Sequence, residues 1–462
     1  MATTMFDRIW DQHVVADLGE GWSLLYLDRL LLHDLSGGRA LRELAAAGRG
    51  VAEPDKVFAV ADHALSSAPG RSAETHPAGE ALERSLRENA ARAGLRYFPP
   101  GARGHGIVHV MAPELGLVLP GLTLVCGDSH TCTNGGLGAL AFGIGASELA
   151  HALATQTLPQ RKPRRMRIRF EGQAAPGVGA KDMILHAIGR LGAGAGTGFA
   201  IEYAGSAVRA LAIEQRLTLC NLSIEMGAKI GMIAPDDATF AWLEGRDYAP
   251  RGRAWERALA DWQRLPSDPD ARFDADHLIA MEEVAPQITW GTSPAHVAPV
   301  SGRVPEDADP AVLDYMGLSP GQRLEGTPID WVFIGSCTNA RLSDLREAAA
   351  ILRGRRIAPQ VTAWVVPGSE MVKQAAEAEG LDRLFRDAGF SWREPGCALC
   401  VAANGEAVPP GARCVSTSNR NFVGRQGAGA RTHLASPATA AASALAGAIV
   451  DPRSFPCSPS AA

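Results

Sequence analysis

Short apolar runs alternate along this chain with segments whose apolar residues recur at helical spacing. The runs over 122–126, 330–334 and 361–366 are continuous and rich in β-branched residues, which predicts buried strands. Apolar residues three and four apart predict a helix over 342–352. This alternation of strands and helices indicates an α/β fold with largely parallel sheets.

Polar clusters directly follow several of the predicted strands. The strand over 122–126 runs into Gly-Asp-Ser-His-Thr, and the strand over 330–334 runs into Gly-Ser-Cys-Thr-Asn. A short strand over 414–416 opens into Thr-Ser-Asn-Arg-Asn. Open α/β sheets bind their ligands just beyond the carboxyl ends of the strands. We therefore expect these clusters to supply a functional site.

Two changes in composition predict domain boundaries. A basic, proline-containing stretch over 159–165 precedes a new predicted strand over 166–170, and the chain becomes polar and proline-rich after about residue 290. A length of 462 residues suits about three domains. We predict α/β/α domains over 1–163, 164–294 and 295–462, and the last ends in a disordered tail that follows Pro452 and contains Cys457.

Charge and composition argue against several partners and locations. The chain has 45 Lys and Arg against 50 Asp and Glu, a net charge of −5, which does not favour nucleic acid or an anionic membrane. It contains no apolar run of about 20 residues, and its N-terminus lacks the pattern of a signal or transit peptide. We expect a cytoplasmic protein. Eight cysteines are too few for a disulfide scaffold but sufficient for one metal or cluster site.

Three of the cysteines form a candidate ligand set. Cys397 and Cys400 make a C-x-x-C motif, and Cys337 lies 60 residues upstream, just after a predicted strand. Three converging thiolates could hold a cubane iron–sulfur cluster with one iron open to substrate, and Ser336 and Asn339 could donate hydrogen bonds to it. An isolated structural or redox C-x-x-C beside an unrelated cysteine fits the spacing equally well. Four other cysteines are expected mainly to pack in the core: Cys126, Cys132, Cys220 and Cys414.

Histidines and carboxylates at strand ends are candidate acid–base groups. Asp128 and His130 follow one predicted strand, Asp62 and His63 end another over 58–62, and His109 lies in an apolar stretch that we take for a strand. A single histidine on an apolar strand is more often a core residue than a catalyst. Paired with carboxylates, however, imidazoles can donate protons near neutral pH.

Two further groups have an open interpretation. Arg420 and Arg425, with Asn419, form a glycine-containing loop that suits carboxylate or phosphate, although an exposed basic loop has the same pattern. Glu225 lies on a predicted apolar helix with Asn221 four residues earlier. A buried carboxylate there would need a partner, and an exposed helix face is equally compatible with the pattern.

The combined motifs resemble a known family. Gly-Asp-Ser-His-Thr, Gly-Ser-Cys-Thr-Asn with the distant C-x-x-C, and Thr-Ser-Asn-Arg-Asn-Phe-Val-Gly-Arg-Gln-Gly together resemble the aconitase superfamily of iron–sulfur dehydratases. Nearly the whole chain is similar to the large subunits of 3-isopropylmalate dehydratases. The resemblance implies three aconitase-type α/β/α domains around a central iron–sulfur site. It also implies a hydro-lyase that isomerises a hydroxy-dicarboxylate, most directly 2-isopropylmalate to 3-isopropylmalate in leucine biosynthesis.

The resemblance also implies a role for each candidate residue. Cys337, Cys397 and Cys400 would hold one [4Fe–4S] cluster per subunit, with one iron not ligated by protein. The acid–base roles would fall to His130 with Asp128, His63 with Asp62, His109 supporting Asp128, and Glu225. The substrate would be bound by Arg420, Arg425, Asn419 and Ser129. The cluster would be lined by Asn221, Ser336 and Asn339.

Full-length aconitases have a swivelling fourth domain, which this sequence lacks by the same resemblance. In isopropylmalate dehydratases a separate small subunit carries that domain, so we expect such a partner in a heterodimer or heterotetramer. The positions at which the sequence departs from the usual family pattern include Ala64, His105, Leu115, Cys132 and Ala340.

These departures keep homoaconitate, citramalate or citraconate, and dimethylmalate open as substrates. An iron-sensing RNA-binding protein is a further alternative, although the net charge argues against it. A zinc protein that uses the three cysteines and a histidine is another.

Overall fold

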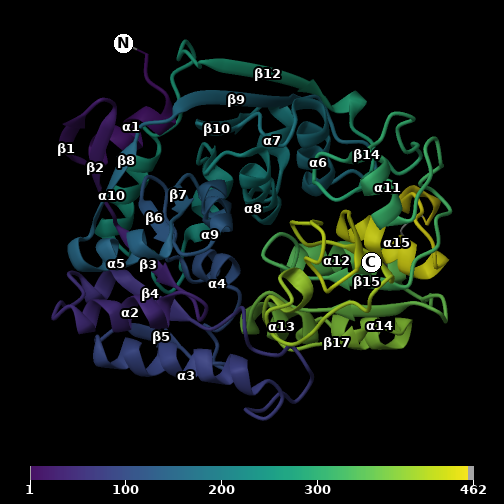
Figure 1. The fold of residues 1–462 in the computed structure, drawn as a ribbon. Helices are drawn as coiled ribbons and strands as arrows, with labels where there is room; N and C mark the ends of the chain where they lie inside the picture. Colours follow the sequence, from purple (N-terminus) through teal and green to yellow (C-terminus); the bar gives the residue numbers. More distant parts are fainter. Residues whose placement is uncertain (1, 456–462) are drawn as a thin grey trace. The chain divides into compact units, whose positions relative to one another are not determined.

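The computed structural model describes residues 2–455 (Figure 1). The chain divides into two compact units, each built from separate stretches of sequence. Unit 1 comprises residues 1–62, 80–172 and 194–280, and unit 2 comprises 63–79, 173–193 and 281–462. Within the described residues, no helix has the length and apolar character needed to cross a membrane.

Unit 1 contains a five-stranded sheet in the order β5-β4-β3-β6-β7, and all its neighbouring strands are parallel. Every residue of β4 and β6 is buried. Burial on both faces explains why these strands appear in the sequence as continuous apolar runs. The strands of this sheet are β3 (Arg29–Leu32), β4 (Val57–Val60), β5 (Arg96–Phe98), β6 (Thr123–Cys126) and β7 (Leu140–Gly143).

Unit 1 also contains a four-stranded parallel sheet in the order β11-β10-β9-β12. In β9 the arginines alternate with buried Met166, Ile168 and Phe170, so one face packs inward. On the other face, Arg165 and Arg167 pair with Asp274 and Asp276. The four strands are β9 (Arg164–Glu171), β10 (Phe199–Ala204), β11 (Ile230–Ile233) and β12 (Ala275–Ala280).

The remaining elements of unit 1 are an antiparallel sheet and a set of helices. The sheet is β1 (Val14–Gly19), β2 (Trp22–Tyr26) and β8 (Thr157–Arg161). The helices are α1 (Met5–His13), α2 (Gly37–Ala46), η1 (Pro54–Lys56), α3 (Pro77–Arg92), whose first residues count with unit 2, α4 (Val108–Leu115), η2 (Ser129–Leu137), α5 (Ala146–Thr155), α7 (Ser206–Ala210), α8 (Ile213–Asn221), η3 (Leu222–Met226), α9 (Asp237–Leu243) and α10 (Arg253–Trp262).

Unit 2 is built on a five-stranded parallel sheet in the order β17-β16-β15-β18-β19. Helix α12 packs against α14 and α15, and α15 contacts β15 (Figure 1). The strands are β15 (Trp331–Ile334), β16 (Thr362–Val365), β17 (Ser391–Trp392), β18 (Arg413–Ser416) and β19 (Arg431–Leu434), with a separate hairpin of β13 (Gln287–Thr289) and β14 (Val297–Pro299). The helices are α6 (Ala180–Leu191), η4 (Met281–Glu283), α11 (Pro310–Met316), α12 (Leu342–Leu352), α13 (Glu370–Ala378), α14 (Leu381–Ala388), η5 (Ala398–Cys400), α15 (Pro437–Ala446) and η6 (Pro452–Ser454).

Most of the predicted elements are confirmed. The strands predicted at 122–126, 330–334, 361–366 and 414–416 correspond to β6, β15, β16 and β18, and the helix predicted at 342–352 is α12. The three-domain division stays a prediction. The strands of four of the sheets each come from one predicted domain, whereas the β13–β14 hairpin spans the boundary at residue 294.

Three local predictions are wrong in part. The apolar stretch around His109 is the start of helix α4, because the Asp62 carboxylate accepts a hydrogen bond from the Val108 backbone N–H at 2.8 Å. Glu225 lies not on the helix of Asn221 but on the 3-10 turn η3 that follows it. Residues 452–454 form η6 instead of beginning a disordered tail, and the rest of that tail, with Cys457, lies outside the described residues.

Candidate active site

A histidine held between two carboxylates lies beyond strand β6 in unit 1. Asp128 caps the turn η2, because its Oδ1 accepts a hydrogen bond from the His130 backbone N–H at 2.8 Å. The His130 ring contacts Glu225 Oε1 through Nε2 at 2.9 Å and Asp128 Oδ1 through Nδ1 at 3.4 Å. The ring and Glu225 are buried, so this arrangement can hold and move a proton away from bulk water.

The close packing of η2 fixes this arrangement. A side chain at Gly135 would place its Cβ 1.8 Å from the carbonyl oxygen of Gly231 in β11. Only glycine therefore allows η2 to approach that strand. At the end of α8, Asn221 donates a hydrogen bond to Thr133 Oγ1 at 2.7 Å, which links α8 to the same turn.

His109 is fully buried behind Asp128. Its Nδ1 lies 3.2 Å from Asn134 Nδ2 and its Nε2 lies 3.7 Å from Asp128 Oδ2. Because the Asn134 amide, as assigned, is a donor, it fixes Nδ1 as the acceptor and leaves the proton on Nε2, towards Asp128. Burial lowers the pKa of His109 to about 4, so the ring is neutral at pH 7 and can orient Asp128 without sharing a full charge.

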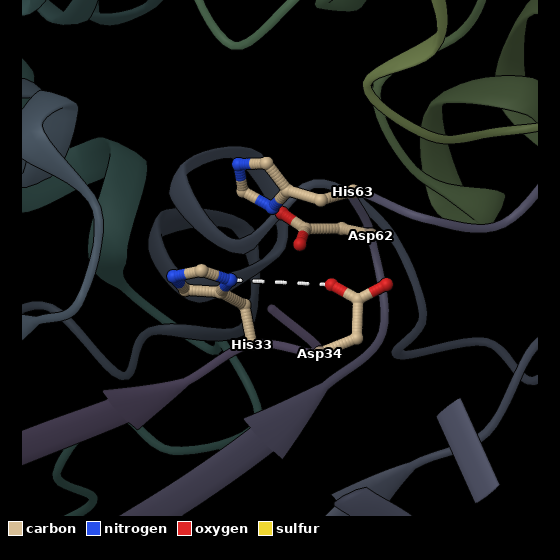
Figure 2. A group of neighbouring side chains, drawn as sticks. All are labelled: His33, Asp34, Asp62 and His63. Carbon is tan, nitrogen blue, oxygen red and sulfur yellow. Dashed lines mark ion pairs between the residues drawn. The ribbon is translucent and has the colours of Figure 1, made fainter. Parts of the chain in front are cut away.

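A second group of histidines and carboxylates surrounds Asp62 (Figure 2). One ligand atom from each of His33, Asp34, Asp62 and His63 lies within 4.8 Å of the others, and all four residues are buried. His33 Nδ1 is 4.0 Å from Asp34 Oδ1. His33 and Asp34 were not predicted from the sequence. They directly follow strand β3, and Asp128 likewise comes two residues after the end of β6, so their position was an available signal.

The three cysteines predicted as ligands all lie in unit 2, where they are buried and form no disulfide. Cys337 follows β15, while Cys397 directly precedes the turn η5 and Cys400 is its last residue. The Asn419 amide joins two of them, because its Nδ2 lies 3.3 Å from Cys337 Sγ and its Oδ1 lies 3.4 Å from Cys400 Sγ. Ser336 Oγ is 3.2 Å from Cys400 Sγ. The structure therefore brings Cys337 and Cys400, which are 63 residues apart in sequence, to the same amide.

Backbone strain accompanies the thiols. Ser336 has a φ of 78° and Ala398 a φ of 47°, a left-handed conformation that costs free energy for residues other than glycine. Each residue directly precedes or follows one of the cysteines. Residues held in such conformations cluster at functional sites, where the surrounding structure over-determines them.

Buried thiols of this kind can serve as metal ligands. Cysteine thiolates bind zinc in tetrahedral sites and also hold iron–sulfur clusters. The donor set therefore fits an iron–sulfur cluster, and it fits zinc as well.

The arginine loop that follows β18 is anchored at both sides of its tip. Asn421 Nδ2 donates to the Gly291 carbonyl at 2.5 Å, and Gln426 Nε2 donates to Ser416 Oγ at 3.0 Å. Arg420 and Arg425 are both half-buried. The Nε of Arg425 is buried and has no hydrogen-bond partner among residues 2–455. A buried guanidinium N–H without an acceptor is what a site for an anionic ligand requires. It therefore favours the interpretation as an anion-binding loop over that as an exposed basic loop.

Two predicted site residues have less informative surroundings. Ser129 is the half-buried first residue of η2. Asn339 donates through Nδ2 to Asp344 Oδ1 at 2.8 Å, so at least this part of its amide supports the start of α12. Their proposed roles towards substrate and cluster stay predictions.

The match to a family model extends over almost the whole chain. The model described as "Aconitase family (aconitate hydratase)" matches residues 7–447. The chain belongs to the aconitase family. Membership of this family implies an iron–sulfur cofactor, and the buried thiols of unit 2 are suitable ligands for one.

Comparison with individual relatives is more specific. This aconitase-family chain is 59% identical over 462 residues to "3-isopropylmalate dehydratase large subunit 1" of Bradyrhizobium diazoefficiens, covering 98% of this chain and 97% of that protein. Among solved structures, aconitase X of Thermococcus kodakaraensis in its holo-form matches with a TM-score of 0.48 and 13% identity, covering 90% of this chain and 89% of that one.

The named positions where this aconitase-family chain departs from the usual pattern are all buried. His105 contacts the Ala61 carbonyl oxygen through Nε2 at 2.8 Å, and Cys132 Sγ lies 3.5 Å from the Asn221 carbonyl oxygen. Both therefore pack behind residues of the candidate site. The other named departures are Ala64, Leu115 and Ala340.

Proposed function

We propose that this chain is the large, cluster-bearing subunit of an iron–sulfur hydro-lyase that converts 2-isopropylmalate to 3-isopropylmalate in leucine biosynthesis. The observation that carries the proposal is the meeting of Cys337 and Cys400 on the amide of Asn419, in a chain that belongs to the aconitase family. The substrate follows from the relative, which is 59% identical over nearly the full length of both chains.

In this proposal Cys337, Cys397 and Cys400 hold one [4Fe–4S] cluster whose fourth iron has no protein ligand. When bound, the cluster supplies Lewis-acid chemistry at the substrate hydroxyl. Asn419 and Ser336 donate hydrogen bonds to the sulfurs, which fixes the orientation of the ligands. Asn221 and Asn339 keep the cluster-lining roles that the family resemblance implies.

The histidine–carboxylate groups handle protons. His130 holds a proton between Glu225 and Asp128, and His109 fixes the orientation of Asp128. A proton held on His130 is available to a leaving hydroxyl group, which must depart as water. Asp62 and His63 form the second imidazole–carboxylate pair of the proposed mechanism.

The substrate carboxylates bind to the arginine loop. Arg425 offers an Nε–H that no group of residues 2–455 accepts, and Arg420 and Asn419 lie on the same loop. Ser129 adds a hydroxyl. A planar guanidinium binds a carboxylate through two parallel hydrogen bonds, which gives both affinity and orientation.

We further propose a small-subunit partner that carries the swivelling domain, in a heterodimer or heterotetramer located in the cytoplasm. The name "large subunit" of the relative supports a two-chain enzyme. In this proposal, this chain supplies the cluster that turnover requires. The partner supplies the remaining part of the substrate pocket. We therefore expect this chain alone to show little activity.

The test is a reconstituted assay. Both chains are combined anaerobically with iron and sulfide and supplied in turn with 2-isopropylmalate, homoaconitate, citramalate and dimethylmalate. We expect the highest kcat/KM with 2-isopropylmalate. A clear preference for another hydroxy acid would make that acid the substrate. The buried departures from the family pattern, such as His105 and Cys132, would then be the candidates for the change in specificity. Absence of turnover on all four by an iron-loaded pair would refute the proposed activity.

A further inference from the structure

Lys181 is a buried cation of unit 2 that the proposed chemistry does not use. It is the second residue of α6, and 1% of its surface is exposed. Its Nζ donates to the carbonyl oxygens of Thr417 at 3.1 Å and Ser418 at 2.5 Å. Within the described residues it forms no ion pair. Its hydrogen bonds are therefore made to neutral groups and do not neutralise its charge.

The place of this lysine on its helix is also unfavourable. A cation in the first turn of a helix lies at the positive end of the helix dipole. The adjacent carboxylate of Asp182 is already used, because it accepts hydrogen bonds from the backbone N–H of Gly179 at 2.9 Å and of Gln287 at 2.8 Å. A buried, unpaired ammonium needs compensation from an anion close by.

The available anions are the cysteines of the candidate cluster site. Burial lowers the pKa of Lys181 to about 7, and the groups that oppose this effect are first Cys337 and Cys400, and then Asp344 and Asp182. Cysteines that bind metal do so as thiolates, which are anions. A cation buried near two such thiolates would balance part of their charge.

Lys181 is also connected to these cysteines through the backbone. The two carbonyl groups that it binds belong to the residues directly before Asn419. The amide of Asn419 contacts Cys337 and Cys400. A displacement of this short segment would move the amide away from both sulfurs.

We propose that Lys181 is the buried counter-cation of the cysteine cluster site and the positioning residue that holds Asn419 against Cys337 and Cys400. This inference rests on the proposed function, because it requires the thiolates to hold an iron–sulfur cluster. It adds a residue that acts on cluster stability and potential without touching the substrate.

Four variants of the full chain separate charge from hydrogen bonding. Lys181→Met removes both the charge and the donor, Lys181→Gln removes the charge and keeps a donor, and Lys181→Arg keeps both. Lys229→Met is the matched control, because Lys229 is an exposed lysine of unit 1. Each chain is loaded anaerobically with ferrous iron and sulfide. The measurements are iron and sulfide per chain, the rate of cluster loss in a chelator, the cluster reduction potential, and the melting temperature without iron.

We expect Lys181→Met and Lys181→Gln to lose the cluster about tenfold faster, the size expected for losing one nearby charge in a partly polar interior. Their reduction potential should become more negative, because a cation favours the added electron. Lys181→Arg and Lys229→Met should resemble the unmodified chain. Without iron, Lys181→Met should melt no lower than the unmodified chain, since it removes an uncompensated charge.

The outcomes distinguish this inference from the proposed function. If the unmodified chain binds no iron and sulfide, both fail together. If the unmodified chain binds the cluster and Lys181→Gln matches its loss rate and potential, the counter-cation role is refuted while the proposed function stands. If Lys181→Met also matches them, Lys181 has neither role. Should Lys181→Met fail to fold, Lys181→Gln alone decides the question.

Discussion

A buried ion pair in unit 2 offers the sharpest test of how the chain around the cysteines is held. The Glu406 carboxylate accepts hydrogen bonds from Arg393 at 2.8 Å, from Asn404 at 2.8 Å, and from Ser66 and Ser67 at 2.7 to 2.9 Å. The side chains of Arg393 and Glu406 are only 9% and 10% exposed. Glu406 thereby ties the segment after His63 to the segment that contains the C-x-x-C motif.

The perturbation is Glu406→Gln, which removes the charge and changes the shape little. It leaves the Arg393 guanidinium buried without its anion, although that group still donates to Ser67 Oγ at 2.8 Å and lies 3.6 Å from the Trp364 ring centre. Breaking one side of a buried pair costs about 3–5 kcal/mol. For a unit of about 220 residues, this corresponds to a fall in melting temperature of about 10 °C.

The pH dependence of this contribution has a definite sign. Burial alone would raise the pKa of Glu406, but donation from Ser67 and the charge of Arg393 lower it overall. The stabilisation is therefore complete above the ordinary carboxyl pKa of 4.5 and is lost as the pH falls through the lower folded value. The loss of unfolding free energy caused by Glu406→Gln should thus be largest at neutral pH and become smaller in acid.

The assay is thermal and urea unfolding of the iron-free chain, with Glu379→Gln as the control. Glu379 pairs with Arg346 in the same unit, but these side chains are 38% and 55% exposed, so that change should cost less than about 1 kcal/mol. If Glu406→Gln unfolds within about 0.5 kcal/mol of Glu379→Gln at neutral pH, the buried pair does not hold these segments as we describe.

Three further predictions concern the candidate site. Arg425→Ala should raise KM by a factor that corresponds to about 1.5–3 kcal/mol and leave the iron content unchanged, and a fully active variant would remove Arg425 from the substrate site. Glu225→Gln should lower kcat by about 10²-fold or more with normal iron content, because it weakens the contact to His130; unchanged kcat would show that this contact is structural. Because the folded pKa of His109 is about 4 against an ordinary 6.5, unit 1 should lose about 3 kcal/mol of stability between pH 6.5 and pH 4, and His109→Gln should reduce that slope in urea unfolding. An equal slope in both chains would contradict the buried, neutral state of His109.

The sequence predicts several strands of the two five-stranded sheets, for physical reasons. Strands buried on both faces, such as β6 and β15, appear as unbroken apolar runs, and α12 appears at helical spacing. The polar clusters after these strands are also visible in the sequence, because each strand ends where the sequence changes from apolar to polar and glycine-rich. These features depend on neighbouring residues in the sequence, so the sequence pattern is sufficient to predict them.

Features that depend on distant partners were not predictable. Glu225 meets His130 across 95 residues, and the carboxylate that caps α4 comes from Asp62, 46 residues away. Lys181 resembles an ordinary lysine at the start of an amphipathic helix until the fold places Thr417 and Ser418 over its ammonium group. Such contacts leave no mark in the spacing of residues along the chain.

The segmentation of the chain shows the same limit. Residues 63–79 and 173–193 count with the C-terminal unit by their contacts, although both lie far from it in sequence. Composition detects a proline-rich linker but not the hydrogen bonds of Ser66 and Ser67 to Glu406. His33 and Asp34 were missed although they follow strand β3, because a His-Asp pair alone is a weak signal.

The central claim is that Cys337, Cys397 and Cys400 hold a catalytic iron–sulfur cluster, and metal analysis of the anaerobically purified chain tests it most directly. The unmodified chain and the control Cys414→Ser, which changes a buried cysteine of β18, should be brown and contain about four irons and four sulfides per chain. Cys337→Ser should lose most of the iron and sulfide. A colourless chain with one zinc, or a Cys337→Ser chain with the full iron and sulfide content, would contradict the account.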